Sequence, residues 1–189
     1  MLVIAHDEGL PCCGGLSGHA ARRVYNDPVG RDGTSYSQVM LTASKTSVWR
    51  GRYQIDADGR PVAVWDPSWW RNGGAFEIDG QRFEVRANGW GTKYRMYDAA
   101  GNEVALVERA GRKYWSVQAD GRMYEFRRSS FFGNRQELVV GGEPAGEVRR
   151  TGAWSGNIEA DLPGLPLPLQ IFVVGVQIAI WQAQQASSS

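Results

Sequence analysis

The C-terminal stretch 165–181, LPLPLQIFVVGVQIAIW, constrains the fold most, because it holds no charged residue and has to be removed from water. Pro166 and Pro168 suit an extended approach followed by the first turn of a helix. The residues that follow predict a helix at about 168–184 that is apolar on almost all sides. A helix of this kind is buried.

Two environments are open to this helix, a bilayer and the interior of the same protein. Its apolar run is interrupted by Gly175 and Gln177, and it is short for a bilayer core, which requires about 20 apolar residues. No lysine or arginine flanks it, so the usual signals of membrane orientation are missing. Gln170, Gln177 and Gln184 form a narrow polar stripe that suits protein partners better than lipid. We expect a core helix, with a tail-anchored membrane protein as the alternative.

From residue 38 onward, short patterned segments alternate with turn signals such as Asp79-Gly80. Apolar and polar residues alternate within the segments, as expected for strands with one buried face. The pattern predicts about twelve antiparallel strands, the first near 39–43 and the last near 154–160. A closed sheet of that size leaves a lumen, which the C-terminal helix can fill. We therefore expect a mainly β fold over residues 38–189, a closed β-barrel enclosing the C-terminal helix.

Four segments carry a resemblance to a known family: FEIDGQRFEVRA (76–87), YRMYDAAGNEVALVER (94–109), KYWSVQADGRMYEFRRS (113–129) and the apolar C-terminal stretch. Over about residues 38–184 the chain resembles the tubby C-terminal-like superfamily, and within it the LURP-one-related proteins and their bacterial relatives. The resemblance implies a twelve-stranded barrel around a central hydrophobic helix. Tubby domains bind phosphoinositides, and the terminal helix of the related phospholipid scramblases has been argued to enter membranes. No phosphate-binding motif of tubby domains can be matched here residue by residue.

Residues 1–37 lack a strand or helix pattern and predict a flexible or loosely packed N-terminal arm. The arm holds both histidines and both cysteines of the chain, and its potential zinc ligands are His6, Asp7, Glu8, Cys12, Cys13 and His19. Their spacing matches none of the usual zinc patterns, so we expect no metal and no cofactor. Adjacent cysteines rarely bridge each other, and the N-terminus lacks a secretory pattern. Both features favour a cytoplasmic location.

The folded part lacks the residues that most enzymes use, since no histidine or cysteine follows residue 20. Several aspartates fall in expected turns, where they serve the backbone: Asp56, Asp58, Asp79, Asp98 and Asp120. Several glutamates fall on the expected outer face: Glu77, Glu84, Glu103, Glu108 and Glu125. We therefore expect a protein that is not an enzyme. A small-ligand carrier or an enzyme that uses the lumen is the alternative.

Basic residues at expected strand ends provide the main functional signal in a chain of net charge +1. We expect a basic rim formed by Arg112, Lys113, Arg127, Arg128, Arg149 and Arg150. Such a rim suits anionic phospholipid headgroups or a protein partner, whereas the alternative is a self-paired surface. The loop with Trp69, Trp70 and Arg71 adds a second candidate, because one of two adjacent tryptophans in a strand faces outward. We expect a binding module at the membrane periphery and no nucleic-acid partner.

Overall fold

A computed structural model describes residues 39–46, 51–68, 73–129, 134–151 and 156–186, all within one compact unit, Ser35–Ser189. The described part is mainly β. Its elements in chain order are β1 (Met40–Lys45), β2 (Tyr53–Ala57), β3 (Arg60–Ser68), β4 (Gly73–Ile78), β5 (Gln81–Ala87), β6 (Lys93–Tyr97), β7 (Glu103–Glu108), β8 (Tyr114–Ala119), β9 (Arg122–Arg128), β10 (Arg135–Val140), β11 (Glu143–Thr151), β12 (Asn157–Asp161) and α1 (Leu167–Ala186).

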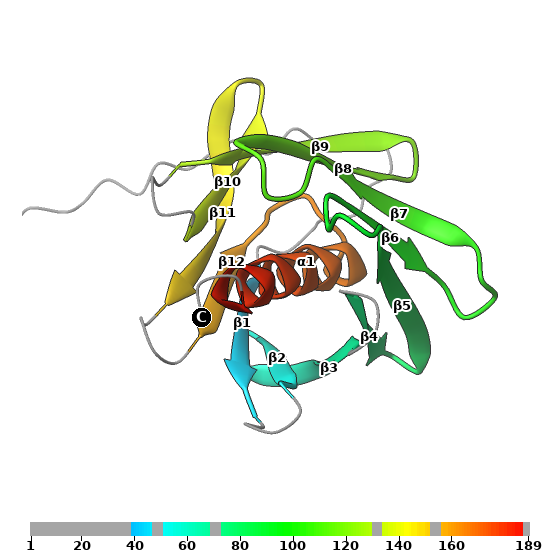
Figure 1. Cartoon of the computed structure of the whole chain (residues 1–189). Coiled ribbons are helices and arrows are strands. Elements are labelled where there is room, and N and C mark those ends of the chain that lie inside the picture. Colours follow the sequence, from blue (N-terminus) through cyan, green and yellow to red (C-terminus); the bar gives the residue numbers. More distant parts are fainter. Residues whose placement is uncertain (1–38, 47–50, 69–72, 130–133, 152–155, 187–189) are drawn as a thin grey trace, which may run out of the picture. The chain divides into compact units, whose positions relative to one another are not determined.

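The twelve strands form one closed antiparallel barrel (Figure 1). Each strand pairs with its neighbours in the sequence, and the barrel closes where β1 pairs with β12, with Met40 opposite Asp161 and Ala43 opposite Ile158. Closure leaves no sheet edge open to another chain. The expected barrel of about twelve antiparallel strands is confirmed.

Three of the hairpins turn on an Asp-Gly pair, as the sequence predicts: Asp58-Gly59, Asp79-Gly80 and Asp120-Gly121. Both residues of each pair have a positive φ, for example 49° at Asp58 and 76° at Gly59. This is the conformation of a type I′ turn, whose twist matches that of the two strands it joins. The antiparallel order places these turns at one end of the barrel, the end at which α1 begins.

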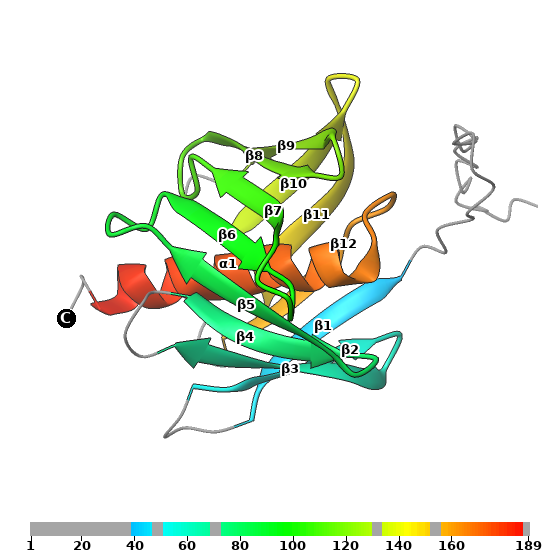
Figure 2. The ribbon, with the colours of Figure 1, turned by 90° about the vertical axis from the view of Figure 1, so that its right-hand side faces the viewer.

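Helix α1 runs along the lumen, and Figure 2 shows it lengthwise within the strands. Its central residues, such as Phe172 and Val174, are buried together with the inward side chains of the strands. A Cβ atom on Gly175 would lie 2.2 Å from the Trp65 ring, so the helix and β3 are in close contact there. By length and composition α1 could cross a bilayer, a property it shares with the core helices of soluble proteins. The expected core position of the helix is confirmed.

The glutamine stripe of α1 is only partly provided with hydrogen-bond partners. Gln170 is buried, and its Nε2 donates to the carbonyl oxygen of Leu165 at 2.8 Å. Gln177 is 1% exposed, and neither of its amide atoms has a partner among the described residues. Gln184 is exposed. Gln177 thus lies against protein groups, as expected, but its amide carries an uncompensated cost of desolvation.

We expect Gln177→Met to stabilise the protein. Methionine keeps the length of the side chain and removes a buried amide without partners, which should raise the free energy of unfolding by roughly 1–3 kcal/mol. Urea denaturation measures the change. The matched substitution Gln184→Met, at the exposed end of the same helix, should stay within about 0.5 kcal/mol of the parent. A loss of stability in Gln177→Met would show that the amide does have a partner in solution.

We expect Gly175→Ala to destabilise the protein. Alanine is the better helix former by about 1 kcal/mol, but its Cβ would overlap the Trp65 ring, and overpacking typically costs about 1–3 kcal/mol or more. Because the nearest atoms belong to a buried indole that cannot move aside freely, we expect net destabilisation in the same urea assay. Gly89→Ala is the control, since nothing lies within 4 Å of its added Cβ. Equal stabilities of the two variants would contradict the close contact.

Candidate functional site

Acidic and basic residues are segregated between the two ends of the barrel. The end where α1 finishes holds Lys45, Arg52, Arg86, Lys93, Arg109, Arg112, Lys113, Arg127, Arg128, Arg135, Arg149 and Arg150, with the carboxylates Asp66, Glu108, Glu137 and Glu159. The opposite end holds Asp56, Asp58, Glu77, Asp79, Asp98, Glu103, Asp120, Glu143 and Asp161, with the cations Arg60, Arg82 and Arg122. The net charge of +1 conceals this separation, because the two ends carry charge of opposite sign.

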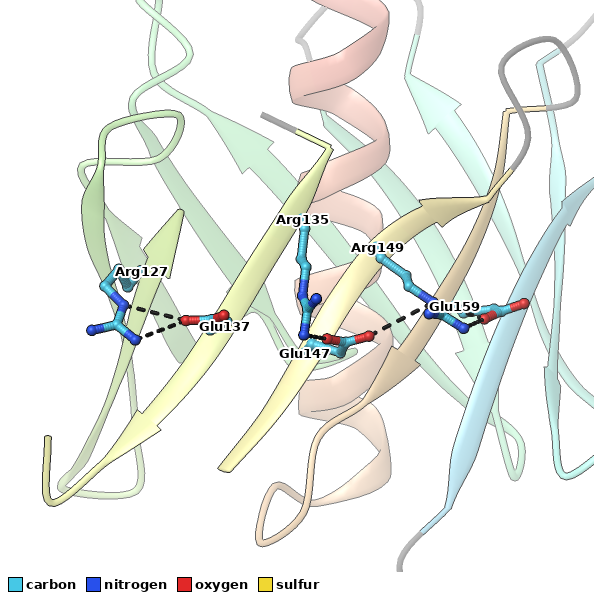
Figure 3. A network of polar contacts seen from close by, with 6 residues as sticks. All are labelled: Arg127, Arg135, Glu137, Glu147, Arg149 and Glu159. Carbon is cyan, nitrogen blue, oxygen red and sulfur yellow. Dashed lines mark hydrogen bonds and ion pairs between the residues drawn. The ribbon is translucent and has the colours of Figure 1, made fainter. Parts of the chain in front are cut away.

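Two residues of the predicted rim, Arg127 and Arg149, form ion pairs on the outer wall (Figure 3). The nearest nitrogen–oxygen distance is 2.8 Å between Arg127 and Glu137, and 2.6 Å between Arg149 and Glu159. The hydrogen bond to Glu137 raises the pKa of Arg127, and the hydrogen bond to Glu159 raises that of Arg149. Each arginine follows a buried residue of its strand, so alternation turns it outward to a carboxylate on the neighbouring strand.

The ion-pair network continues along the outer wall. Arg135 pairs with Glu147, and Glu147 also lies 3.6 Å from Arg149 (Figure 3). Around the barrel, Arg52 pairs with Asp66 at 2.8 Å, and Lys93 pairs with Glu108 at 2.7 Å. These cations are neutralised by neighbours that are themselves partly exposed, and we therefore assign them little role in binding.

Other cations at this end have no carboxylate partner in the described part of the chain. Lys45, Arg128 and Arg150 each stand two residues beyond a buried, lumen-facing residue, namely Ala43, Phe126 and Val148. Strand alternation therefore places these three side chains on the lumen side of the sheet, at the end of the barrel where α1 finishes. Lys113 continues the ladder beside Arg128, whose backbone nitrogen donates to the Lys113 carbonyl at 2.8 Å. We call Lys45, Arg112, Lys113, Arg128 and Arg150 the basic mouth.

The pairing of strands arranges the basic mouth as an arc around the C-terminal end of α1. Lys113 and Arg128 are neighbours across the β8–β9 pair, and Arg128 lies opposite Gln136 on β10. On the far side of β10, the backbone nitrogen of Arg150 donates to Asn134 at 2.8 Å. The arc then passes over β12 to Lys45 on β1. It borders the negative end of the helix macrodipole, which nearby cations stabilise.

An exposed tryptophan lies at the same end of the barrel. Trp90, in the loop between β5 and β6, is 89% exposed. The loop is shaped by Asn88, whose Oδ1 accepts hydrogen bonds from the backbone nitrogens of Thr92 at 2.9 Å and Lys93 at 3.1 Å. Sequence reasoning did not select Trp90, although its setting between two glycines, Gly89 and Gly91, is the signal that marks it as a loop residue.

Several predicted site residues lie outside the described residues. Trp69, Trp70 and Arg71 are among them, although Ser68 and Gly73, which flank them, pair with each other at the end with the basic mouth. The candidate zinc ligands His6, Asp7, Glu8, Cys12, Cys13 and His19 are also outside. Within the described ranges, no three His, Cys, Asp or Glu side chains gather as potential metal ligands.

Lys113→Gln should raise the midpoint of thermal unfolding at low salt. The backbones of Lys113 and Arg128 are neighbours across the strand pair, where like charges are destabilising. The Lys113 ammonium also lies 5.3 Å from the Tyr114 ring, but this contact is exposed and therefore weak. The matched substitution Lys93→Gln removes the same charge at the same end, but it breaks the ion pair that lowers the pKa of Glu108, so it should lower the midpoint or leave it unchanged. High salt should reduce the difference. Equal shifts in the two variants would contradict the distinction between paired and unpaired cations.

Comparison with known proteins provides no functional precedent for this site. No protein-family model, no curated protein and no solved structure matches the chain. The barrel and its basic mouth are therefore the basis on which a function has to be inferred.

Proposed function

We propose that the chain is a non-enzymatic binding module that places its basic mouth on a membrane surface containing anionic phospholipid headgroups. One observation carries the proposal: the five cations of the basic mouth, none of which has a carboxylate partner among the described residues, lie together at one end of the barrel. Each lysine or arginine near an anionic leaflet contributes about 1 kcal/mol of attraction. Several such residues in one arc are enough for reversible association without any insertion.

The opposite end of the barrel supports the same orientation. Its turn aspartates, among them Asp58, Asp98 and Asp120, are repelled by an anionic surface, so the field of the whole barrel turns the basic mouth toward the membrane. The Debye length is about 8 Å at physiological ionic strength, so only the cations nearest the surface contribute strongly. The paired arginines of the outer wall are neutralised locally and add little.

Trp90 favours a lipid surface over a protein partner. An indole that is almost fully exposed is costly in water and is well suited to the interface between headgroups and acyl chains. A basic end with an exposed tryptophan therefore combines electrostatic attraction with shallow apolar insertion. A protein partner with an acidic surface remains the second candidate for the basic mouth, as expected from the sequence.

The fold supports a relationship that we also include in the proposal. A closed twelve-stranded barrel around an apolar helix is the architecture that the resemblance to the tubby C-terminal-like superfamily and its LURP-one-related branch implies. The burial of α1 favours a structural role for the helix over a tail anchor. The packing of Phe172 and Val174 against the strands likewise favours a filled lumen over a carrier or an enzyme. We propose a cytoplasmic protein that associates reversibly with membranes.

Vesicle co-sedimentation tests the proposal. The protein should bind vesicles of phosphatidylcholine with phosphatidylserine at low salt, bind them weakly at high salt, and ignore pure phosphatidylcholine. The double variant Arg112→Glu/Arg128→Glu should lose at least about tenfold in affinity, because each reversal removes about 1 kcal/mol of attraction and adds repulsion. The matched control Arg60→Glu/Arg82→Glu makes the same charge change at the acidic end and should bind as the parent does.

Two results would count against lipid binding. Absence of sedimentation with phosphatidylserine vesicles at low salt would exclude it and leave the acidic protein partner as the candidate. An equal loss in both double variants would show that net charge, and not the basic mouth, is responsible. Resistance of membrane-associated protein to alkaline carbonate extraction would instead support the tail-anchored alternative.

A further inference from the structure

A small hollow opens inside the basic mouth, between the last turns of α1 and the strands around the closure of the barrel. Its volume is about 70 Å³. The polar groups around it come from Lys45, Tyr53, Arg150, Gln182 and Gln185, and Gly156 also borders it. Among the described residues that line it, two are cations and none is a carboxylate.

The pairing of strands explains how distant parts of the sequence form this hollow. β1 and β11 both flank β12, so Lys45 and Arg150 approach from opposite sides. Gly156 precedes β12, and an added Cβ there would lie 3.6 Å from the Tyr53 hydroxyl and 3.8 Å from Arg150 Nη2. The glycine, with φ of 66°, thus stands between these two groups and leaves the space open.

Hydrogen bonds fix the polar groups around the hollow. Tyr53 is buried and hydrogen-bonded to Gln182, and burial raises its pKa, so the phenol stays protonated at neutral pH and able to donate. Arg150 Nη2 donates to the side-chain oxygen of Gln185 at 2.6 Å when that amide is oriented to accept. A guanidinium carries five N–H donors, so others remain for a ligand.

We propose that this hollow binds a phosphate monoester group, with Lys45 and Arg150 as its charge partners and the Tyr53 hydroxyl and Gln182 amide as further donors. The inference rests on the proposed function only for one source of that group, a lipid headgroup. A soluble phosphate monoester is the other source with the same chemistry. The hollow is far smaller than the roughly 300–1,000 Å³ of a pocket that encloses a whole small molecule, so it receives one tetrahedral group while the rest of the ligand stays outside.

The charge balance favours an anion despite the nearby helix end. The C-terminus of a helix is equivalent to about half a negative charge, which the two full positive charges of Lys45 and Arg150 exceed. Charge-assisted hydrogen bonds to phosphate are short and strong, and an arginine can contact two phosphate oxygens at once. Stabilising the helix end therefore leaves a positive excess in the hollow.

NMR titration tests the proposal, with inorganic phosphate as the probe and chloride at matched ionic strength as the reference. Phosphate should produce saturable shifts at the backbone amides of Lys45 and Gly156 and at the side-chain amide of Gln182. Gln182→Glu, which puts a carboxylate into the hollow at almost unchanged size, should weaken binding at least about tenfold. Gln184→Glu adds the same charge two residues away on the same helix, outside the lining, and should retain the shifts. Dispersed spectra would establish that both variants are folded.

Vesicles containing phosphatidic acid, whose headgroup is a phosphate monoester, separate the two sources. If Gln182→Glu loses both phosphate and vesicle binding, the headgroup is the source; if it loses phosphate alone, the ligand is a soluble monoester. Shifts that do not saturate, or that are equally strong in Gln182→Glu, would overturn the proposal even if the parent protein binds vesicles. Saturable phosphate binding without vesicle binding would support the phosphate site in the hollow and contradict the proposal of lipid binding.

Discussion

The burial of α1 in the lumen is the interaction on which the rest of the structure depends. A closed sheet of twelve strands is too wide to fill with its own side chains, and an apolar helix cannot remain in water. Each part therefore removes the other's exposed apolar surface. The close contact at Gly175, where the helix meets the Trp65 ring, shows that the fit is tight enough to exclude even one methyl group.

The same strand alternation that builds the core also divides the cations at the end of the barrel. Arg127 and Arg128 are adjacent in sequence, yet the first faces the outer wall and pairs with Glu137, whereas the second follows the lumen side and has no carboxylate partner among the described residues. Arg149 and Arg150 repeat the division. The position of a cation along its strand thus decides whether it is available to a ligand. The available cations gather at the end of the barrel, beyond the last buried side chains.

Local patterns predicted most of the fold. Asp-Gly turns, alternating strands and the apolar run predicted about twelve strands and a core helix at about 168–184, close to the observed Leu167–Ala186. They also predicted a basic rim, and alternation beside Phe126 could have separated its paired from its unpaired members. The hollow could not be predicted, because Lys45 and Gly156 meet only through the closure of β1 on β12, which is a long-range pairing. The lack of a hydrogen-bond partner for the Gln177 amide could not be predicted either, since the sequence of a helix does not reveal which strands face it.

The closure of β1 on β12 has a consequence for the assembly of the molecule. Met40 and Asp161 are partners, so the first strand emerges from the ribosome long before the strand that completes its pairing, and the helix that fills the lumen follows later still. Until then the nascent sheet has open edges and an apolar inner face, the features that promote association with other chains. Pairing between residues so far apart in sequence also slows folding. The chain is thus expected to fold only after its last helix is synthesised, and to need protection from aggregation until that point.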